Sequence, residues 1–132
     1  MNELRIRKLT FSAAHYLPKH TKCSVIHGHT YVLRNIFIRY PEDRFVDFEE
    51  IKRIIKSWDH RFIIPAKDAR VWEEIAEKWT FTLQISFGLK VIDGDPTVEN
   101  IARAIAREIK EKTAAEEVHF ELYEGLDQGA VV

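Results

Sequence analysis

Two histidines separated by a single residue, His27 and His29, are the first candidates for chemistry in this sequence. They begin a run rich in β-branched and aromatic residues, which predicts a strand. Side chains two positions apart on a strand point to the same face, so both imidazoles can reach one ion. Gly28 between them leaves the opposite face bare, where backbone or a substrate can approach closely.

A third imidazole, His15, ends the apolar stretch that precedes this pair. A hairpin that returns from His15 to His29 would bring the three rings together. Three neutral nitrogen ligands with one open position are the arrangement of a catalytic zinc ion rather than a closed structural one. Spacing alone also allows an ordinary pair of histidines on a strand.

Cys23, the only cysteine in the chain, lies four residues before His27. Its spacing leaves three interpretations open: a fourth metal ligand that closes the site, a buried inert thiol, or a catalytic thiolate. A single cysteine also excludes an intrachain disulfide and is compatible with a reducing compartment.

Asp59 and His60 follow directly on a predicted helix. A carboxylate can orient an imidazole and stabilise its protonated form, which suits acid–base chemistry. The alternative is a histidine that is merely favoured by the dipole at the C-terminal end of a helix.

Glu124 ends the last predicted strand, residues 117–124, and continues the parity of its apolar inward positions. A carboxylate at the end of an apolar stripe is either frayed into solvent or held for a ligand. Glu121 lies on the outward parity and fits a ligand site less well.

The remaining patterns describe the scaffold. Strands are predicted over residues 3–16, with a bulge near Arg7–Lys8, and over 28–40, where Ile36 and Ile38 are expected opposite the histidine face. Asp47 is expected to cap a helix that runs to Trp58. Further predictions are a helix from Asp68 to Trp79 with an inward apolar stripe, strands over 81–87 and 89–92, and a helix that starts at Pro96.

The composition bounds the class of protein. A chain of 132 residues predicts one domain, residues 1–132, and 45% apolar residues suffice for a core. A net charge of −1 without a basic tail argues against nucleic-acid binding. The N-terminus has no apolar signal core, and no apolar run reaches membrane-spanning length. We therefore expect a soluble cytoplasmic protein that does not bind membranes.

Taken together, the motifs resemble the 6-pyruvoyltetrahydropterin synthase family, which includes the 6-carboxytetrahydropterin synthases. They span nearly the whole chain in this order: Phe11-x-Ala13-Ala14-His15, Cys23-x-x-x-His27-Gly28-His29-x-Tyr31, Asp47-Phe48, Asp59-His60, Pro96-Thr97-x-Glu99-Asn100 and Glu124. The resemblance implies an α+β T-fold, a four-stranded antiparallel sheet with two helices on one face, assembled into a homo-hexamer with active sites between subunits. Residues 65–93 depart from the shorter family pattern and look like an insertion.

The resemblance also assigns roles to residues. It implies Zn²⁺ bound by His15, His27 and His29, and a catalytic thiolate base at Cys23. Asp59 and His60 match the relay pair of the family. Glu124 matches the residue that anchors the pterin, and Thr97 either contacts the pterin or caps the following helix with Asp95.

The implied reaction is a zinc-dependent conversion of 7,8-dihydroneopterin triphosphate. The short Cys-x-x-x-His-Gly-His spacing and the small size are closer to the enzymes that form 6-carboxytetrahydropterin, acetaldehyde and triphosphate in queuosine-type deazapurine biosynthesis. One alternative is the pyruvoyl product from the same substrate. Another is a non-catalytic pterin-binding module with a structural metal. The presence of Cys23, Asp59 and His60 argues against this alternative, because binding alone requires none of them.

Overall fold

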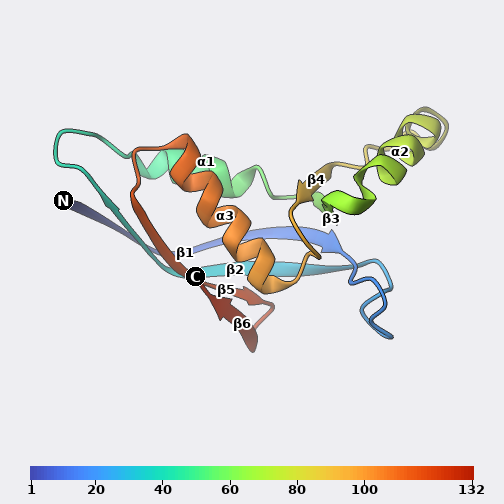
Figure 1. The fold of residues 1–132 in the computed structure, drawn as a ribbon, viewed down its shortest axis with the longest axis horizontal. Coiled ribbons are helices and arrows are strands. Elements are labelled where there is room, and N and C mark those ends of the chain that lie inside the picture. Colours follow the sequence, from blue (N-terminus) through green and yellow to red (C-terminus); the bar gives the residue numbers. More distant parts are fainter.

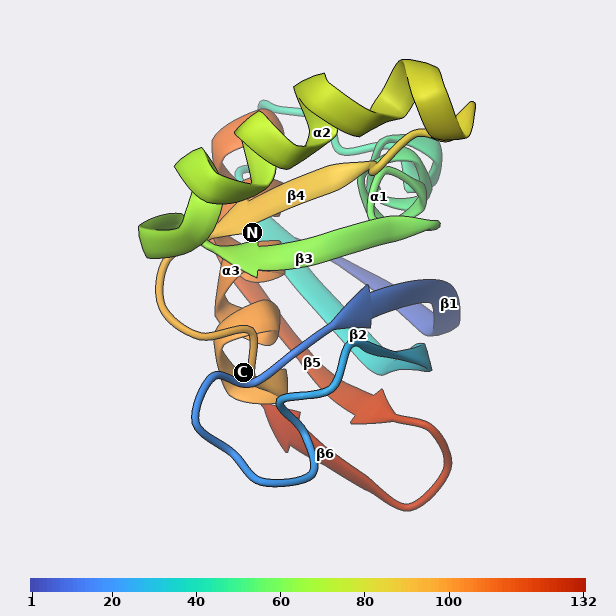
Figure 2. The same ribbon diagram turned by 90° about the vertical axis from the view of Figure 1, so that its right-hand side faces the viewer.

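One mixed six-stranded sheet organises the computed structural model, which describes residues 1–132. Its strand order is β4-β3-β1-β2-β5-β6 (Figures 1 and 2). The long strands β1 (Asn2–His15) and β2 (His27–Tyr40) pair antiparallel at its centre. On one side β5 (Glu117–Glu124) and the short β6 (Gln128–Val131) continue antiparallel. On the other side β3 (Arg61–Pro65) and β4 (Leu89–Ile92) are parallel to β1.

The prediction of an α+β protein is confirmed, but the prediction of four antiparallel strands was wrong. The difference comes from β3 and β4, which extend the sheet beyond β1. The chain reaches β3 through α1, and β3 is parallel to β1 and therefore antiparallel to β2, the strand before the helix. Ile63 and Ile64 of β3 are fully buried, which explains why these short strands belong to the core.

Two helices cover one face of the sheet, α1 (Phe48–Lys56) and α3 (Val98–Lys112), as Figure 1 shows. Asp47 caps α1 as predicted: its carboxylate accepts a hydrogen bond from Glu49 N, and its own N–H donates to the Glu50 carboxylate. The predicted apolar stripe of α1 is buried except for Phe48, which is half exposed at the first turn. The buried stripe therefore begins one turn later, at Ile51.

The change of parity predicted near Arg7–Lys8 is present, because both side chains are exposed and the inward positions of β1 change parity there. The pairing of β1 with β2 nevertheless keeps its register across this point. The partner strand makes the matching change at Asn35, whose φ of 53° is in the left-handed region. The irregularity in register consequently appears between β2 and β5.

This backbone feature corrects a second prediction. Ile36 and Ile38 were expected on the face opposite to Tyr31 and Leu33. All four side chains instead lie in the same core, with at most 1% of their surface exposed. The extra residue at Asn35 returns the strand to the core face, an effect that strict alternation does not include.

The segment between β3 and β4 is helical for longer than predicted. After a short 3₁₀ helix, η1 (Ala66–Asp68), α2 runs over Ala69–Leu83 and ends at Gln84 in the left-handed conformation. The strand predicted over 81–87 is therefore wrong: its alternation is real, but no neighbouring strand pairs with it. No residue of α2 is buried, so the inward stripe predicted at Val71, Trp72, Ile75 and Trp79 is also not a core face.

In Figure 1, α2 projects from the end of the sheet where β3 and β4 lie, away from α1 and α3. None of the helices has the length and apolar character that crossing a membrane would require.

Candidate metal centre and active site

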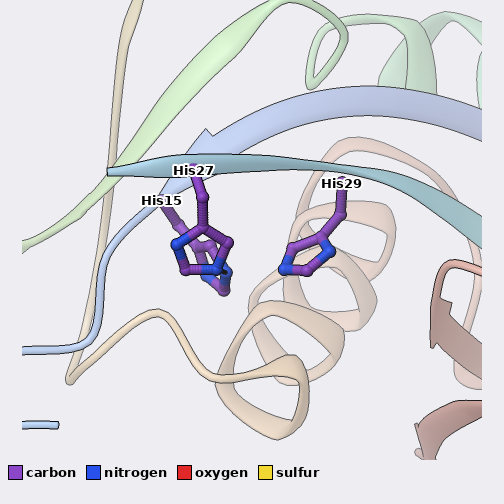
Figure 3. Close-up of side chains that lie close together, drawn as sticks. All are labelled: His15, His27 and His29. Atoms are coloured by element: carbon purple, nitrogen blue, oxygen red, sulfur yellow. Dashed lines mark hydrogen bonds between the residues drawn. The ribbon is translucent and has the colours of Figure 1, made fainter. Parts of the chain in front are cut away.

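Three imidazoles converge at one end of the central strand pair. His15 is the last residue of β1 and pairs with His27, the first residue of β2, while His29 follows on the same face. Figure 3 shows the three rings projecting to the same side of the strands. One nitrogen from each ring lies within 4.8 Å of the others. The hairpin expected from the sequence thus brings His15, His27 and His29 together.

Two backbone carbonyls fix how these rings present their nitrogens. His15 Nδ1 lies 2.7 Å from the carbonyl oxygen of Pro96, and His27 Nδ1 lies 2.6 Å from that of Val25. A carbonyl only accepts, so each Nδ1 carries the proton and each Nε2 keeps its lone pair. The two Nε2 atoms face each other at 3.0 Å. Such outer partners are the usual means of orienting histidine ligands toward a metal.

The protonation state of the cluster suits metal binding. The pKa of His15 is lowered to about 4, chiefly by burial and also by the neighbouring His27 and His29, against the opposing effect of the hydrogen bond to Pro96. Burial, followed by the proximity of His27, also lowers the pKa of His29. Neutral imidazoles at neutral pH are the form that binds a metal. The residues therefore fit a divalent ion such as Zn²⁺, held by three nitrogens with a position left for a further ligand.

Glu124 lies beside this cluster. It pairs with Tyr31 of β2, and its Oε2 is 4.0 Å from His29 Nε2. Only 17% of the side chain is exposed. Burial raises the pKa of this carboxyl, Glu99 adds to the rise, and His27 opposes it. The structure thus places a partly buried acceptor group next to the histidines, at the inward parity inferred from the sequence.

Thr97 caps α3, because its hydroxyl oxygen accepts a hydrogen bond from Asn100 N at 3.2 Å. Asp95 supports the same turn through its carbonyl oxygen, which accepts from Thr97 N and from Asn100 Nδ2, each at 2.8 Å. The capping alternative for Thr97 is thus observed, with the backbone rather than the side chain of Asp95 taking part.

Cys23 lies in the loop between β1 and β2, and its side chain is partly buried. Its carbonyl oxygen accepts a hydrogen bond from Leu17 N at 2.7 Å, which folds the loop back toward the end of β1. The cluster of ligand atoms consists of the three histidines and does not include the Cys23 thiol. The arrangement therefore gives no support to Cys23 as a fourth ligand.

Asp59 and His60 form a hydrogen-bonded pair in the turn after α1. His60 Nδ1 lies 2.8 Å from Asp59 Oδ2, and the other carboxylate oxygen accepts from Ser12 N at 2.8 Å. His60 N donates to Ser12 O at 2.7 Å, and the φ of His60 is 59°. The hydrogen bond from Ser12 and then that from His60 lower the pKa of Asp59. Because α1 ends at Lys56, His60 is not in its last turn, and the helix-dipole alternative loses its basis.

This pair does not join the histidine cluster within one chain. His60 lines an open groove of about 550 Å³ with Ser12, Ala14, Gly28 and Thr30, and the groove also reaches Ala13 and the cluster residue His29. Ser12, Ala14, Gly28 and Thr30 have the outward parity of β1 and β2, whereas the metal cluster has the inward parity. The hydrogen bonds of Asp59 and His60 go to each other and to Ser12, and none reaches a histidine of the cluster.

The carbonyl oxygens of Pro96 and Val25 are functional features that the sequence patterns did not identify. The Pro96-Thr97 motif indicated that this turn belongs to the site, but it pointed to the Thr97 hydroxyl and not to the Pro96 carbonyl. Nothing in a side-chain pattern marks the carbonyl of Val25 as a partner of a histidine two residues later.

Comparison with known proteins gives a consistent result. The family model described as 6-pyruvoyl tetrahydropterin synthase matches residues 5–132. The 6-carboxy-5,6,7,8-tetrahydropterin synthase of Rickettsia typhi is 32% identical over 114 residues, which cover 78% of this chain and 77% of that protein. A protein of Methanocaldococcus jannaschii named putative 6-carboxy-5,6,7,8-tetrahydropterin synthase is 28% identical, with coverages of 92% and 88%.

Solved structures agree on the fold. A catalytic-residue mutant of Plasmodium vivax 6-pyruvoyltetrahydropterin synthase superposes with a TM-score of 0.61 at 18% identity, covering 99% of this chain and 96% of that one. The Plasmodium falciparum enzyme gives a TM-score of 0.59 at 16% identity with the same coverages. These likenesses confirm the T-fold, here with a six-stranded sheet.

Proposed function

The chain belongs to the 6-pyruvoyl tetrahydropterin synthase family, and from this premise we propose that it is a zinc-dependent 6-carboxytetrahydropterin synthase. Its substrate is 7,8-dihydroneopterin triphosphate, and its products are 6-carboxytetrahydropterin, acetaldehyde and triphosphate. The observation that carries the proposal is the cluster of His15, His27 and His29, whose ligand nitrogens converge within 4.8 Å. The names of the curated relatives favour the carboxy product over the pyruvoyl product.

The metal part of the proposal rests on the donor set. The Pro96 and Val25 carbonyls hold His15 and His27 in the tautomer that presents Nε2, so little reorganisation is needed for binding. A bound zinc ion would supply a Lewis acid for vicinal side-chain hydroxyls of the substrate, which makes the adjacent C–H bond more acidic.

Glu124 is proposed to hold the pterin ring. A carboxylate offers acceptors only, whereas the 2-amino group and the neighbouring ring N–H of a pterin offer paired donors. Its position beside His29 would place the substrate ring within reach of the cluster. Thr97 remains a candidate for a second pterin contact, although its hydroxyl oxygen also caps α3.

Cys23 is proposed as the base that removes the substrate proton, and the Asp59–His60 pair as its acid–base partner. In the pair, Asp59 holds the imidazole at Nδ1, which leaves Nε2 free to exchange a proton. Because the pair makes no hydrogen bond to the cluster within one chain, we propose that a neighbouring copy completes each site. A homo-hexamer with sites between subunits, acting in the cytoplasm in deazapurine biosynthesis, is consistent with this division.

One assay tests the function. Zinc-loaded protein is incubated with dihydroneopterin triphosphate, and triphosphate, acetaldehyde and the pterin product are measured together with the zinc content. The proposal expects all three products in equal amounts. Triphosphate with the pyruvoyl product and without acetaldehyde would identify a 6-pyruvoyltetrahydropterin synthase, and pterin binding without turnover would identify a binding module.

A further inference from the structure

The start of the segment between β3 and β4 is tied to Tyr16, the residue that follows the metal-cluster residue His15. Trp72 Nε1 donates to the Tyr16 hydroxyl oxygen at 2.8 Å, and the Tyr16 hydroxyl donates to Asp68 Oδ2 at 2.8 Å. An indole N–H can only donate and an ionised carboxylate can only accept, so the direction of both hydrogen bonds is fixed. The Tyr16 hydroxyl is therefore held from both sides.

Ring packing supports the same connection. Phe62 of β3 pairs with Ala14 of β1 and packs against both Tyr16 and Trp72. The ring centroids are 5.8 Å apart for Tyr16 and Phe62, 5.9 Å for Tyr16 and Trp72, and 4.8 Å for Phe62 and Trp72. These contacts fasten the beginning of α2 to the end of β1, although the rest of the helix projects outward (Figure 1).

A second interaction connects the same segment to Pro96, whose carbonyl oxygen orients His15. Lys67 of η1 places its Nζ 3.0 Å from Asp95 Oδ1. That oxygen is shielded from solvent and accepts no directed hydrogen bond. The positive charge of the Lys67 ammonium therefore stabilises it in place of a hydrogen bond. Asp95 directly precedes Pro96, whose carbonyl oxygen lies 2.7 Å from His15 Nδ1. Figure 3 shows the three rings on the side of the strands where α3 and the loop before it lie.

We propose that Lys67 and Asp68 are positioning residues for the metal ligand His15. Asp68 acts through Tyr16 on the backbone that carries the imidazole, and Lys67 acts through Asp95 on the backbone carbonyl that orients it. The inference rests on the proposed metal-binding function of the histidine cluster. Its physical basis is that ligands must be held closely in place, so residues behind the ligands affect metal affinity.

The test is a Co²⁺ titration of the metal-free full-length chain in competition with a chromophoric chelator, together with the visible spectrum of the bound Co²⁺. Asp68→Ala and Lys67→Met are each expected to weaken Co²⁺ binding by about tenfold, the lower end of effects at outer partners, and to alter the spectrum. Asp68→Asn keeps an oxygen that accepts from Tyr16 and is expected to restore wild-type affinity.

The matched control is Arg70→Met with Glu74→Gln, an exposed ion pair on α2 with a separation of 3.6 Å. It is expected to leave affinity and spectrum unchanged. If Asp68→Ala fails to fold, Tyr16→Phe takes its place, because it keeps the ring and removes the hydroxyl. The Co²⁺ affinity and spectrum of Tyr16→Phe and Lys67→Met then test the inference.

Wild-type affinity and spectrum in Asp68→Ala and Lys67→Met would overturn the inference, even if their melting temperatures fall, because the role would then be only structural. A wild-type chain that binds no Co²⁺ would overturn the proposed metal site and this inference with it. The two failures are thus distinguished by the behaviour of the wild-type protein.

Discussion

The Nδ1 atom of His15 donates its proton to the carbonyl oxygen of Pro96 across 2.7 Å, and this bond joins the end of β1 to the residues just before α3. Residues separated by 81 positions in the chain are linked at the point where the metal cluster forms. The orientation of a proposed ligand therefore depends on the correct packing of α3, a long-range condition that a local motif cannot express.

Replacing His27 by Ala removes one nitrogen of the cluster. We expect zinc affinity to fall by more than about 100-fold, the upper range for loss of an outer partner, and activity to fall with it. The side chain lies at the edge of the sheet rather than in the core, so the far-ultraviolet circular dichroism should stay as in wild type. Full zinc retention in this variant would refute the ligand assignment.

Replacing Cys23 by Ala separates a base from a ligand. We expect wild-type zinc content and a turnover lower by about 10²- to 10⁴-fold, the range for loss of a general base. Metal analysis and kinetics on one sample provide the measurement. A variant with wild-type turnover would exclude the catalytic role, and one with reduced zinc would indicate a ligand.

Replacing Glu124 by Gln places a donor where two acceptors are needed. The mismatch should cost about 1–3 kcal/mol in pterin binding while zinc content is unchanged. Calorimetry with a non-reactive pterin measures it. Glu121→Gln is the control, because Glu121 already accepts from Asn35 and Tyr123 on the outward parity. Equal losses in both variants would contradict the assignment.

The lowered pKa of His15 predicts a pH dependence of stability in metal-free protein. The folded value is about 4 and the ordinary value is 6.5, so between these limits the unfolded chain binds more protons. Stability is therefore fully present above about pH 6.5 and decreases as the pH falls toward 4. The loss is on the order of 3 kcal/mol for a shift of this size.

Urea unfolding at pH 7.5 and pH 5 measures this dependence. The His15→Gln variant is the control, because it lacks the titrating group and should lose less stability between the two values. An identical loss in both proteins would show that other groups, such as His29, account for the change.

The cap of α1 provides a prediction about folding alone. Asp47→Ala removes the side-chain acceptor for Glu49 N and keeps the backbone N–H that donates to the Glu50 carboxylate, so we expect a loss of about 1 kcal/mol in the free energy of unfolding. Chemical denaturation measures the loss. Asp43→Ala, in the exposed preceding turn, should have no effect. A similar loss in both variants would contradict the capping role.

The sequence correctly predicted features that depend on which face of a strand a side chain occupies. His27 and His29 on one face, and the inward position of Glu124, follow from the period of a strand, and the structure has both; the first strand, predicted over residues 3–16, covers Asn2–His15. Asp47 as a cap follows from hydrogen bonding within one turn.

The errors arose where distant parts of the chain decide the outcome. Residues 81–87 alternate like a strand, yet a strand also needs a neighbour, and α2 extends into this segment instead. Ile36 and Ile38 depend on one left-handed residue, Asn35. The position of the Asp59–His60 pair depends on the turn after α1 reaching Ser12 of β1, a long-range contact that no local pattern encodes.

The pairing of His15 with His27 also has a consequence for the loop that contains Cys23. These two residues are the last pair of the β1–β2 ladder, and residues 16–26 connect them. A metal bound by both would hold the two ends of that loop together and would stabilise the folded arrangement that binds it. Metal binding and the ordering of the Cys23 loop would then be thermodynamically coupled. Amide hydrogen exchange in residues 16–26 should therefore slow when metal is added, more than exchange at the opposite end of the same strands.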